Sequence, residues 1–313
     1  MIHIISGDFH LRETRRFADF KRNLFAIEEV AQNENPDVYD VVGDIFDKRK
    51  PTPLELKVFA IHLDIMLTFV KQINISVGNH DWIDESLTTL DWIINDRIKI
   101  AKEIKLKENG RDILLTHRTI TEAKLGPEEI HINGVSYKSL KYDIVISGHI
   151  HKPQVVNPLK PLVLIPGSIE RVNFGERNEQ KYIWVLDIKT KKVNLTKHLL
   201  QCRQMYYIEY NIDTKATKVN DKEVKSLPDI GAAIIKVKFY GKRSTINKIN
   251  YDKLIEKFEK AYSVDFKFSY TDTNVKYNDN VKKVDNEKEL IKEYFEEQNI
   301  DKRVQKKVLE IMQ

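Results

Sequence analysis

Short clusters of aspartate, histidine and asparagine recur along the first half of the chain, and each offers metal ligands. Carboxylate and amide oxygens together with imidazole nitrogens suit Mn²⁺, Fe or Zn²⁺. Two of the clusters space their residues two apart, so on an extended chain both side chains point to one face. The clusters hold Asp8 and His10, then Asp44, then Asn79 and His80, then His117, and finally His149 and His151. These residue types predict a metal centre.

Two cations in such a centre would act on a phosphate ester. A carboxylate such as that of Asp44 can bridge two ions, and ions about 3.5–4 Å apart can clamp the attacking and leaving oxygens of an in-line displacement. The ions also lower the pKa of a bound water enough to supply hydroxide near neutral pH. The predicted chemistry is therefore hydrolysis at phosphorus.

Short apolar runs must position these clusters. We expect buried strands over residues 2–5, 38–42, 73–77, 113–115 and 144–146. Each run is followed at once by one of the clusters, and the stretches between the first three runs are long enough for helices. This alternation predicts an α/β fold. Because ligands bind beyond the carboxyl ends of strands in open α/β sheets, we expect the clusters to meet there.

Apolar periodicity predicts the remaining elements of the first 200 residues. Helical spacing occurs within residues 11–34, and helices are also expected over 54–70 and 85–95. Residues 126–141 are expected to form a loop or small hairpin. Residues 162–166 and 182–188 alternate apolar and polar side chains, which favours antiparallel strands.

The motifs stand in the order found in the calcineurin-like metallophosphoesterases, which this chain resembles. They are Asp-x-His, Gly-Asp-x-x-Asp, Gly-Asn-His-Asp, a lone His and Gly-His-x-His. The segment Pro166–Glu176 narrows the resemblance to DNA repair nucleases of the Mre11/SbcD type, closest to the SbcD-like branch of bacteria and bacteriophages. The resemblance implies a two-layer β-sandwich flanked by α-helices, followed by a small α+β capping domain and a C-terminal helix pair.

The resemblance also implies the roles of the site residues. One ion would be held by Asp8, His10, Asp44 and His151. The other would be held by Asp44, Asn79, His117 and His149. Both ions would be Mn²⁺, with Mg²⁺ or Fe²⁺ possible in their place. His80 would face the scissile phosphate and either stabilise developing charge or protonate the leaving oxygen, which is general-acid work that suits an imidazole. Archaeal and eukaryotic relatives often carry a second histidine where this chain has Asp47.

Basic and amide side chains near the motifs are candidates for contacts with the DNA backbone. The candidates are Arg12, Lys48, Arg49, Lys50, Arg171 and Asn173. The alternative for Arg12 and for residues 48–50 is a solvated surface. The alternative for Arg171 and Asn173 is a structural turn.

Composition sets wider limits on the protein. Among 313 residues the net charge is +5 and the pI is near 8.9, which is compatible with a nucleic-acid partner. Cys202 is the only cysteine, which excludes an internal disulfide and a cysteine-based zinc site. No apolar run approaches the ~20 residues of a membrane span, so we expect a cytoplasmic protein. Four histidines match no motif and are expected to be structural or on the surface: His3, His62, His131 and His198.

The pattern changes after residue 200, and we expect four segments. Residues 1–200 would form the nuclease domain and 201–272 a capping domain that orients DNA, with strands over 205–212, 232–240 and 264–270 and a helix over 251–262. Residues 273–286 would be a linker. Residues 287–313 read as two short amphipathic helices. Such a pair could fold back on the capping domain, or bind the coiled coil of a Rad50/SbcC-type ATPase, as the resemblance implies. It also implies a homodimer through the helices near Trp82 and Trp92.

The predicted function is that of a Mn²⁺-dependent DNA nuclease with two activities. The resemblance implies 3′→5′ exonuclease action on duplex ends, and endonuclease action on single strands or hairpins, with the ATPase, in DNA repair, recombination or replication. One alternative is a general metallophosphoesterase that acts on nucleotides or phosphoproteins. The other is a non-catalytic scaffold that binds DNA and the ATPase.

Overall fold

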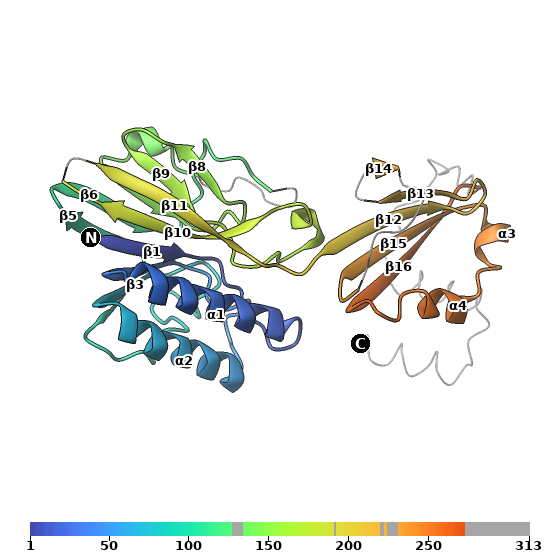
Figure 1. Cartoon of the computed structure of the whole chain (residues 1–313), viewed down its shortest axis with the longest axis horizontal. Coiled ribbons are helices and arrows are strands. Elements are labelled where there is room, and N and C mark those ends of the chain that lie inside the picture. Colours follow the sequence, from blue (N-terminus) through green and yellow to red (C-terminus); the bar gives the residue numbers. More distant parts are fainter. Residues whose placement is uncertain (127–133, 191, 220–221, 224–230, 273–313) are drawn as a thin grey trace, which may run out of the picture.

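The computed structural model describes residues 1–126, 134–190, 192–219, 222–223 and 231–272. Its strands form three sheets (Figure 1). The first sheet contains β1 (Ile2–Ser6), β2 (Val38–Val42), β3 (Gln72–Ser76), β4 (Ile98–Ala101), β10 (Lys181–Ile188) and β11 (Val193–Leu200), in the order β11-β10-β1-β2-β3-β4. Strands β1 to β4 run parallel, and β10 and β11 add an antiparallel edge.

Two helices cover one face of this sheet, where they lie side by side in Figure 1. They are α1 (Phe17–Glu34) and α2 (Pro53–Phe69). Helix α2 begins with a capping box, in which Thr52 and Glu55 satisfy each other's backbone amides. The apolar faces of both helices pack on β1, β2 and β3 around Phe20, Phe59 and Tyr39, all fully buried. Strands buried on both faces are typical of parallel sheets, which explains their continuous apolar runs.

The second sheet packs against the opposite face of the first. It contains β5 (Ile104–Glu108), β6 (Arg111–Thr116), β7 (Ile144–Ser147), β8 (Gln154–Asn157) and β9 (Leu162–Ile165), in the order β5-β6-β7-β9-β8. Val42 and Trp184 from the first sheet meet Leu115 and Ile146 from the second in one buried apolar cluster. The result is a two-layer β-sandwich with helices outside, which confirms the predicted fold class.

The third sheet belongs to the α+β part of the chain. It contains β12 (Met205–Asn211), β13 (Ala216–Val219), β14 (Lys222–Glu223), β15 (Ile234–Gly241) and β16 (Ser263–Tyr270), in the order β14-β13-β12-β15-β16. Two short helices, α3 (Arg243–Ile246) and α4 (Tyr251–Glu256), lie between its last strands in sequence. The helix predicted over 251–262 is therefore shorter than expected, because turns replace it after Glu256. The predicted linker and C-terminal helix pair lie outside the described residues.

A buried carboxylate joins the third sheet to the sandwich. Arg203, just before β12, donates to both oxygens of Asp19 in α1, at 2.6 and 2.8 Å. Asp19 is almost fully buried and also accepts from Arg16 at 3.1 Å. The cationic part of Arg203 lies 4.0 Å from the centre of the Tyr262 ring. These contacts hold the residues just before β12, the first strand of the third sheet, against α1.

Replacing Asp19 with Asn is expected to lower the free energy of unfolding by about 3 kcal/mol at pH 7, because it leaves buried guanidinium groups short of a counter-charge. Burial alone would raise the Asp19 pKa, but Arg203 and Arg16 outweigh it and lower the pKa below its ordinary 3.8. A lowered pKa stabilises the fold above pH 3.8, and this stabilisation is lost as the pH falls below that value. Urea unfolding from pH 7 to pH 3.5 should show the difference between wild type and variant shrinking. A constant difference would contradict the assignment.

The helix predicted over residues 85–95 is wrong, because the structure has turns there. The Asp84 carboxylate accepts from the backbone amides of Ser86 and Leu87, and the Asp91 carboxylate accepts from Thr88. Such local bonds compete with helical hydrogen bonds.

The prediction of an antiparallel strand over residues 162–166 is only half right, since β9 runs parallel to β7 and antiparallel to β8. No helix of the described part of the chain is long and apolar enough to cross a membrane.

Candidate metal centre

The candidate site lies where the carboxyl ends of β1, β2, β3, β6 and β7 converge. Glycines let the loops approach closely. A Cβ added at Gly78 would lie 2.2 Å from the Asp44 amide nitrogen, and one added at Gly148 would lie 2.0 Å from the Val42 carbonyl oxygen. These distances are far below contact, so only glycine fits. The loops after β2, β3 and β7 are thus packed backbone against backbone.

Four candidate ligands adopt a left-handed backbone conformation. The φ angles of Asp8, His10, Asp44 and His149 are 48°, 46°, 50° and 79°. Such conformations are uncommon outside glycine and cost roughly 1–3 kcal/mol each. They gather at functional sites, where the surrounding fold holds them. The four strained residues of this site are thus all candidate metal ligands that the sequence motifs contain.

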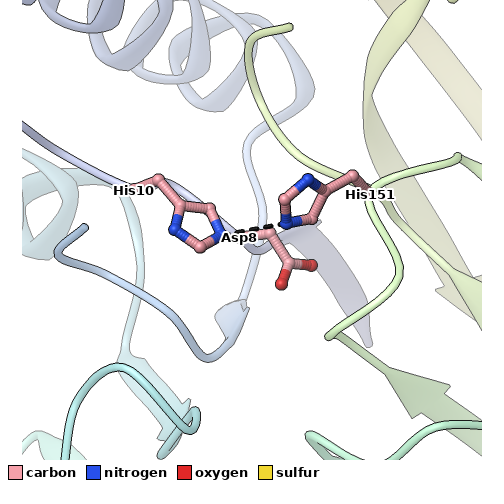
Figure 2. A group of neighbouring side chains, drawn as sticks. All are labelled: Asp8, His10 and His151. Carbon is pink, nitrogen blue, oxygen red and sulfur yellow. Dashed lines mark hydrogen bonds between the residues drawn. The ribbon is translucent and has the colours of Figure 1, made fainter. Parts of the chain in front are cut away.

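The first ligand group comprises Asp8, His10 and His151. Figure 2 shows the imidazoles of His10 and His151 facing each other, with Asp8 between them. The two Nε2 atoms are 3.0 Å apart. Ligand atoms from all three residues lie within 4.8 Å of one another. This spacing fits a single divalent cation.

The second ligand group comprises Asp44, His117 and His149, again with ligand atoms within 4.8 Å of one another. The His117 Nε2 atom lies 3.1 Å from Asp44 Oδ2 and 3.8 Å from Asp8 Oδ1. The side-chain oxygen of Asn79 lies 2.9 Å from His149 Nδ1. All seven candidate ligands are therefore brought together.

Two of the histidines are held in the tautomer that suits a metal ligand. His117 Nδ1 lies 2.8 Å from the Val42 carbonyl oxygen, which can only accept, so Nδ1 carries the hydrogen. His151 Nδ1 lies 3.0 Å from Glu176 Oε1, another acceptor. Both bonds leave Nε2 to the site. Partners of this kind orient metal ligands and raise their basicity.

The site attracts positive charge. Burial raises the pKa of Asp8 to about 6 despite the nearby His117. Burial alone would lower the pKa of His117, but Asp44 and Asp8 outweigh it and raise the pKa to about 10, so Nε2 would have to give up a proton to bind a metal ion. Burial likewise opposes ionisation of Asp44, but His117 outweighs it and holds the Asp44 pKa well below its ordinary value. The buried atom Asp8 Oδ2 has no hydrogen-bond partner among the described residues, and the buried His117 Nε2 atom faces Asp44 Oδ2 at 3.1 Å. Divalent cations fit this donor set.

His80 borders both ligand groups. Its Nδ1 lies 2.9 Å from the Asp47 carbonyl oxygen, so Nδ1 carries the hydrogen and Nε2 is the atom available to a substrate. One ring nitrogen lies within 4.8 Å of ligand atoms of His10 and Asp44. The backbone amide of His80 donates to Asp44 Oδ1 at 2.8 Å. The ring is only partly buried, unlike the ligands Asp8 and His10.

Two supporting carboxylates had no role assigned from the sequence. Asp81 is fully buried and accepts from the amides of Ile45 and Gly78, each at 2.9 Å, so it ties the β2 and β3 loops together. Burial, with the nearby Asp44 charge, raises the Asp81 pKa to about 6. Glu176 supports His151. Both belong to motifs quoted from the sequence, but their hydrogen-bond partners depend on the folded chain.

The candidate DNA contacts differ in how exposed their side chains are. Lys48, Arg49 and Lys50 are exposed beside the site. Arg12 is mostly buried, with its guanidinium 3.5 Å from Asp47 Oδ1 and 3.1 Å from the Val172 carbonyl oxygen.

The other two candidates belong to the fold itself. Arg171 is buried and donates to the carbonyl oxygens of Glu179 and Arg203, at 2.9 and 2.7 Å. Asn173 precedes a single 3₁₀ turn, residues 174–176, and its Oδ1 is buried without a hydrogen-bond partner. The structural alternative thus describes Arg171 better than a contact with DNA.

The three unassigned histidines that the structure describes are not part of the ligand groups. His3 is buried, with Nδ1 2.7 Å from Asp40 Oδ2. His62 is buried between Tyr39 and Glu28. His198 is partly exposed, 3.0 Å from Glu34, and His131 lies outside the described residues.

Replacing Glu176 with Gln is expected to weaken Mn²⁺ binding about 10- to 100-fold, the usual cost of losing an outer partner of a ligand histidine. Burial would raise the Glu176 pKa, but His151 and Lys181 outweigh it and lower it to about 2, so a carboxylate faces His151. Isothermal calorimetry with Mn²⁺ measures the effect. Glu179→Gln is the matched control, because Glu179 also pairs with Lys181. Equal affinities for both variants would overturn the prediction.

Comparisons with known proteins agree with this geometry at the level of the family. The model of the calcineurin-like phosphoesterase superfamily domain matches residues 1–191. No curated protein matches the chain.

Several solved structures are similar in fold. A single mutant of Vps29 from Entamoeba histolytica is 16% identical, with a TM-score of 0.43, and the match covers 72% of this chain and 100% of that one. An archaeal phosphodiesterase is 22% identical, with a TM-score of 0.40, over 63% of this chain and 100% of that one. A predicted phosphoesterase from Streptococcus pneumoniae is 16% identical, with a TM-score of 0.37, over 63% of this chain and 88% of that one.

The family match covers every candidate ligand and the sandwich up to the end of β10. Members of this family bind divalent metals and generally hydrolyse phosphoester bonds. The chain belongs to the calcineurin-like phosphoesterase superfamily.

Proposed function

We propose that this chain is a Mn²⁺-dependent DNA nuclease of the Mre11/SbcD type. The observation that carries the proposal is the pair of ligand groups that meet at Asp44, with His80 beside both. One ion would be held by Asp8, His10, Asp44 and His151, and the other by Asp44, Asn79, His117 and His149. The proposed substrate is a DNA phosphodiester, cut from 3′ ends of duplexes and within single strands or hairpins.

The chemistry that two such cations supply is charge neutralisation at the phosphate and a water of lowered pKa as nucleophile. The protein residues do the rest. The Asp47 carbonyl holds the His80 ring by Nδ1, so a proton on Nε2 can pass to the leaving 3′ oxygen. The left-handed backbone at Asp8, His10 and Asp44 fixes the ligands before substrate arrives.

Features outside the ligand set favour DNA over a small ester. Lys48, Arg49 and Lys50 are exposed directly after Asp47, where a phosphate backbone could extend from the site. The segment Pro166–Glu176, which carries the resemblance, reaches the site through Glu176. The third sheet, linked through Arg203, adds surface that a small substrate does not need.

The test is digestion of linear duplex DNA labelled at either end, with Mn²⁺, Mg²⁺ or chelator. Bis(p-nitrophenyl) phosphate and a phosphomonoester are the control substrates. The proposal predicts Mn²⁺-dependent loss of the 3′ label first. Hydrolysis of small esters alone would favour the general metallophosphoesterase. No hydrolysis of any substrate, even with an ATPase partner, would favour the non-catalytic scaffold.

We further propose that residues 287–313, which lie outside the described residues, bind the coiled coil of a Rad50/SbcC-type ATPase. Their amphipathic pattern supports a helix-in-groove mode. A chain truncated after residue 284 should lose this partner in a pull-down and keep Mn²⁺-dependent cleavage. Retained partner binding would refute the proposal.

A homodimer is also proposed, although the helix over 85–95 that motivated it is absent. Leu87, Trp92 and Ile94 are large apolar side chains exposed in that segment, which supports an interface there. Light scattering at micromolar concentration should give twice the 36.8 kDa of the chain. A monomer mass would contradict the proposal.

A further inference from the structure

We propose that a groove lined by Trp82, two residues after His80, binds an unpaired nucleobase of the substrate strand, stacked on the Trp82 ring. This inference rests on the proposed nuclease function and names a subsite for it. The groove has a volume of about 500 Å³ and is lined by Arg49, Trp82, Asp84, Glu85 and Lys102.

Two of the lining residues lie close in the sequence to His80 and to the residue that holds its ring, Asp47. His80 Nδ1 bonds to the Asp47 carbonyl oxygen. In the sequence, Trp82 lies two residues after His80, and Arg49 lies two residues after Asp47. Between His80 and Trp82, the buried Asp81 is anchored to the amides of both neighbouring loops. Trp82 therefore lies on backbone that is fixed relative to the ligands.

The lining chemistry suits a nucleotide. Trp82 is only partly buried, so its ring can meet a flat ligand, and every base offers a face for stacking. Arg49 and Lys102 are exposed cations that suit the flanking phosphates. The Asp84 carboxylate is already bonded to Ser86 and Leu87.

Stacking on Trp82 would also discriminate between paired and unpaired bases. Inside a duplex both faces of a base are covered by its neighbours, so an internal base must leave the stack before it can lie on Trp82. Glu85 is exposed and offers acceptors for the amino groups of such a base. The groove thus fits single strands, hairpin loops and frayed ends.

The test compares Trp82→Ala, Trp82→Phe and a control, Phe25→Ala, whose ring is exposed on α1 away from the groove. The two probes are a single-stranded oligonucleotide and an abasic sugar-phosphate strand of equal length. Affinity is measured by fluorescence anisotropy in chelator, and KM with Mn²⁺. We expect Trp82→Ala to weaken binding and raise KM roughly tenfold on the base-containing strand only. Trp82→Phe should restore most of the loss, and Phe25→Ala should match wild type.

Two outcomes would overturn the inference. One is unchanged affinity for the base-containing strand in Trp82→Ala. The other is an equal loss on both strands, which would indicate a structural role for Trp82. Failure of the nuclease proposal would look different. Wild type would then leave both strands intact, while Trp82-dependent binding in chelator would still support the groove.

Discussion

Replacing Asp44 with Asn is expected to abolish binding of both metal ions and all phosphodiesterase activity. Asp44 Oδ2 lies 3.1 Å from His117 Nε2 and 3.8 Å from His10 Nε2, so this one carboxylate faces both ligand groups. Asn keeps an oxygen that accepts from the His80 amide but removes the negative charge. A neutral ligand cannot bridge two divalent cations effectively. The loss of metal affinity should therefore exceed the 100-fold that is the upper range for losing a hydrogen-bond partner of a metal ligand.

Calorimetric titration with Mn²⁺ measures this prediction. Asp64→Asn is the control, because Asp64 is an exposed carboxylate on α2. The control should bind Mn²⁺ like wild type, and Asp44→Asn should give no saturable binding in the same range. Wild-type stoichiometry in Asp44→Asn would exclude Asp44 as a shared ligand.

Replacing His80 with Asn is expected to reduce kcat on DNA by roughly 10²–10⁴, the range for loss of a general acid. The Asn side-chain amide can still donate to the Asp47 carbonyl, as His80 Nδ1 does at 2.9 Å. What disappears is the second ring nitrogen. Mn²⁺ affinity should therefore stay at the wild-type value, since His80 is not proposed as a ligand.

The leaving group separates proton donation from other roles of His80. A p-nitrophenolate leaves without needing a proton, so the loss in His80→Asn should be much smaller on bis(p-nitrophenyl) phosphate than on DNA. Equal losses on both substrates would contradict general-acid catalysis. A parallel fall in Mn²⁺ affinity would instead make His80 a ligand.

The gathering of the candidate ligands at one place was predictable, because position and residue type coincide in the sequence. Each of the five motif-bearing apolar runs became a strand and is followed at once by a candidate ligand, as Val42 is by Gly43 and Asp44. Strands β1, β2 and β3 of the first sheet and β6 and β7 of the second end close together, and this brings the residues that follow them to one site. The left-handed φ of Asp44 was not predictable, since only the packed loops impose it.

Other features depend on contacts that spacing does not encode. Glu176 lies far from His151 in the chain, and only the folded sandwich brings them to 3.0 Å. Strand β5, Ile104–Glu108, was missed although its side chains alternate between buried and exposed. The false helix over 85–95 arose because apolar spacing there matched a helix, whereas the Asp84 carboxylate captures the backbone amides locally.

The central claim is that two divalent cations share Asp44 in this centre. The most direct measurement is anomalous diffraction from crystals soaked in Mn²⁺. The account predicts two peaks, one among Asp8, His10, His151 and Asp44, and the other among Asp44, Asn79, His117 and His149. A single peak, or peaks that Asp44 does not contact, would contradict it.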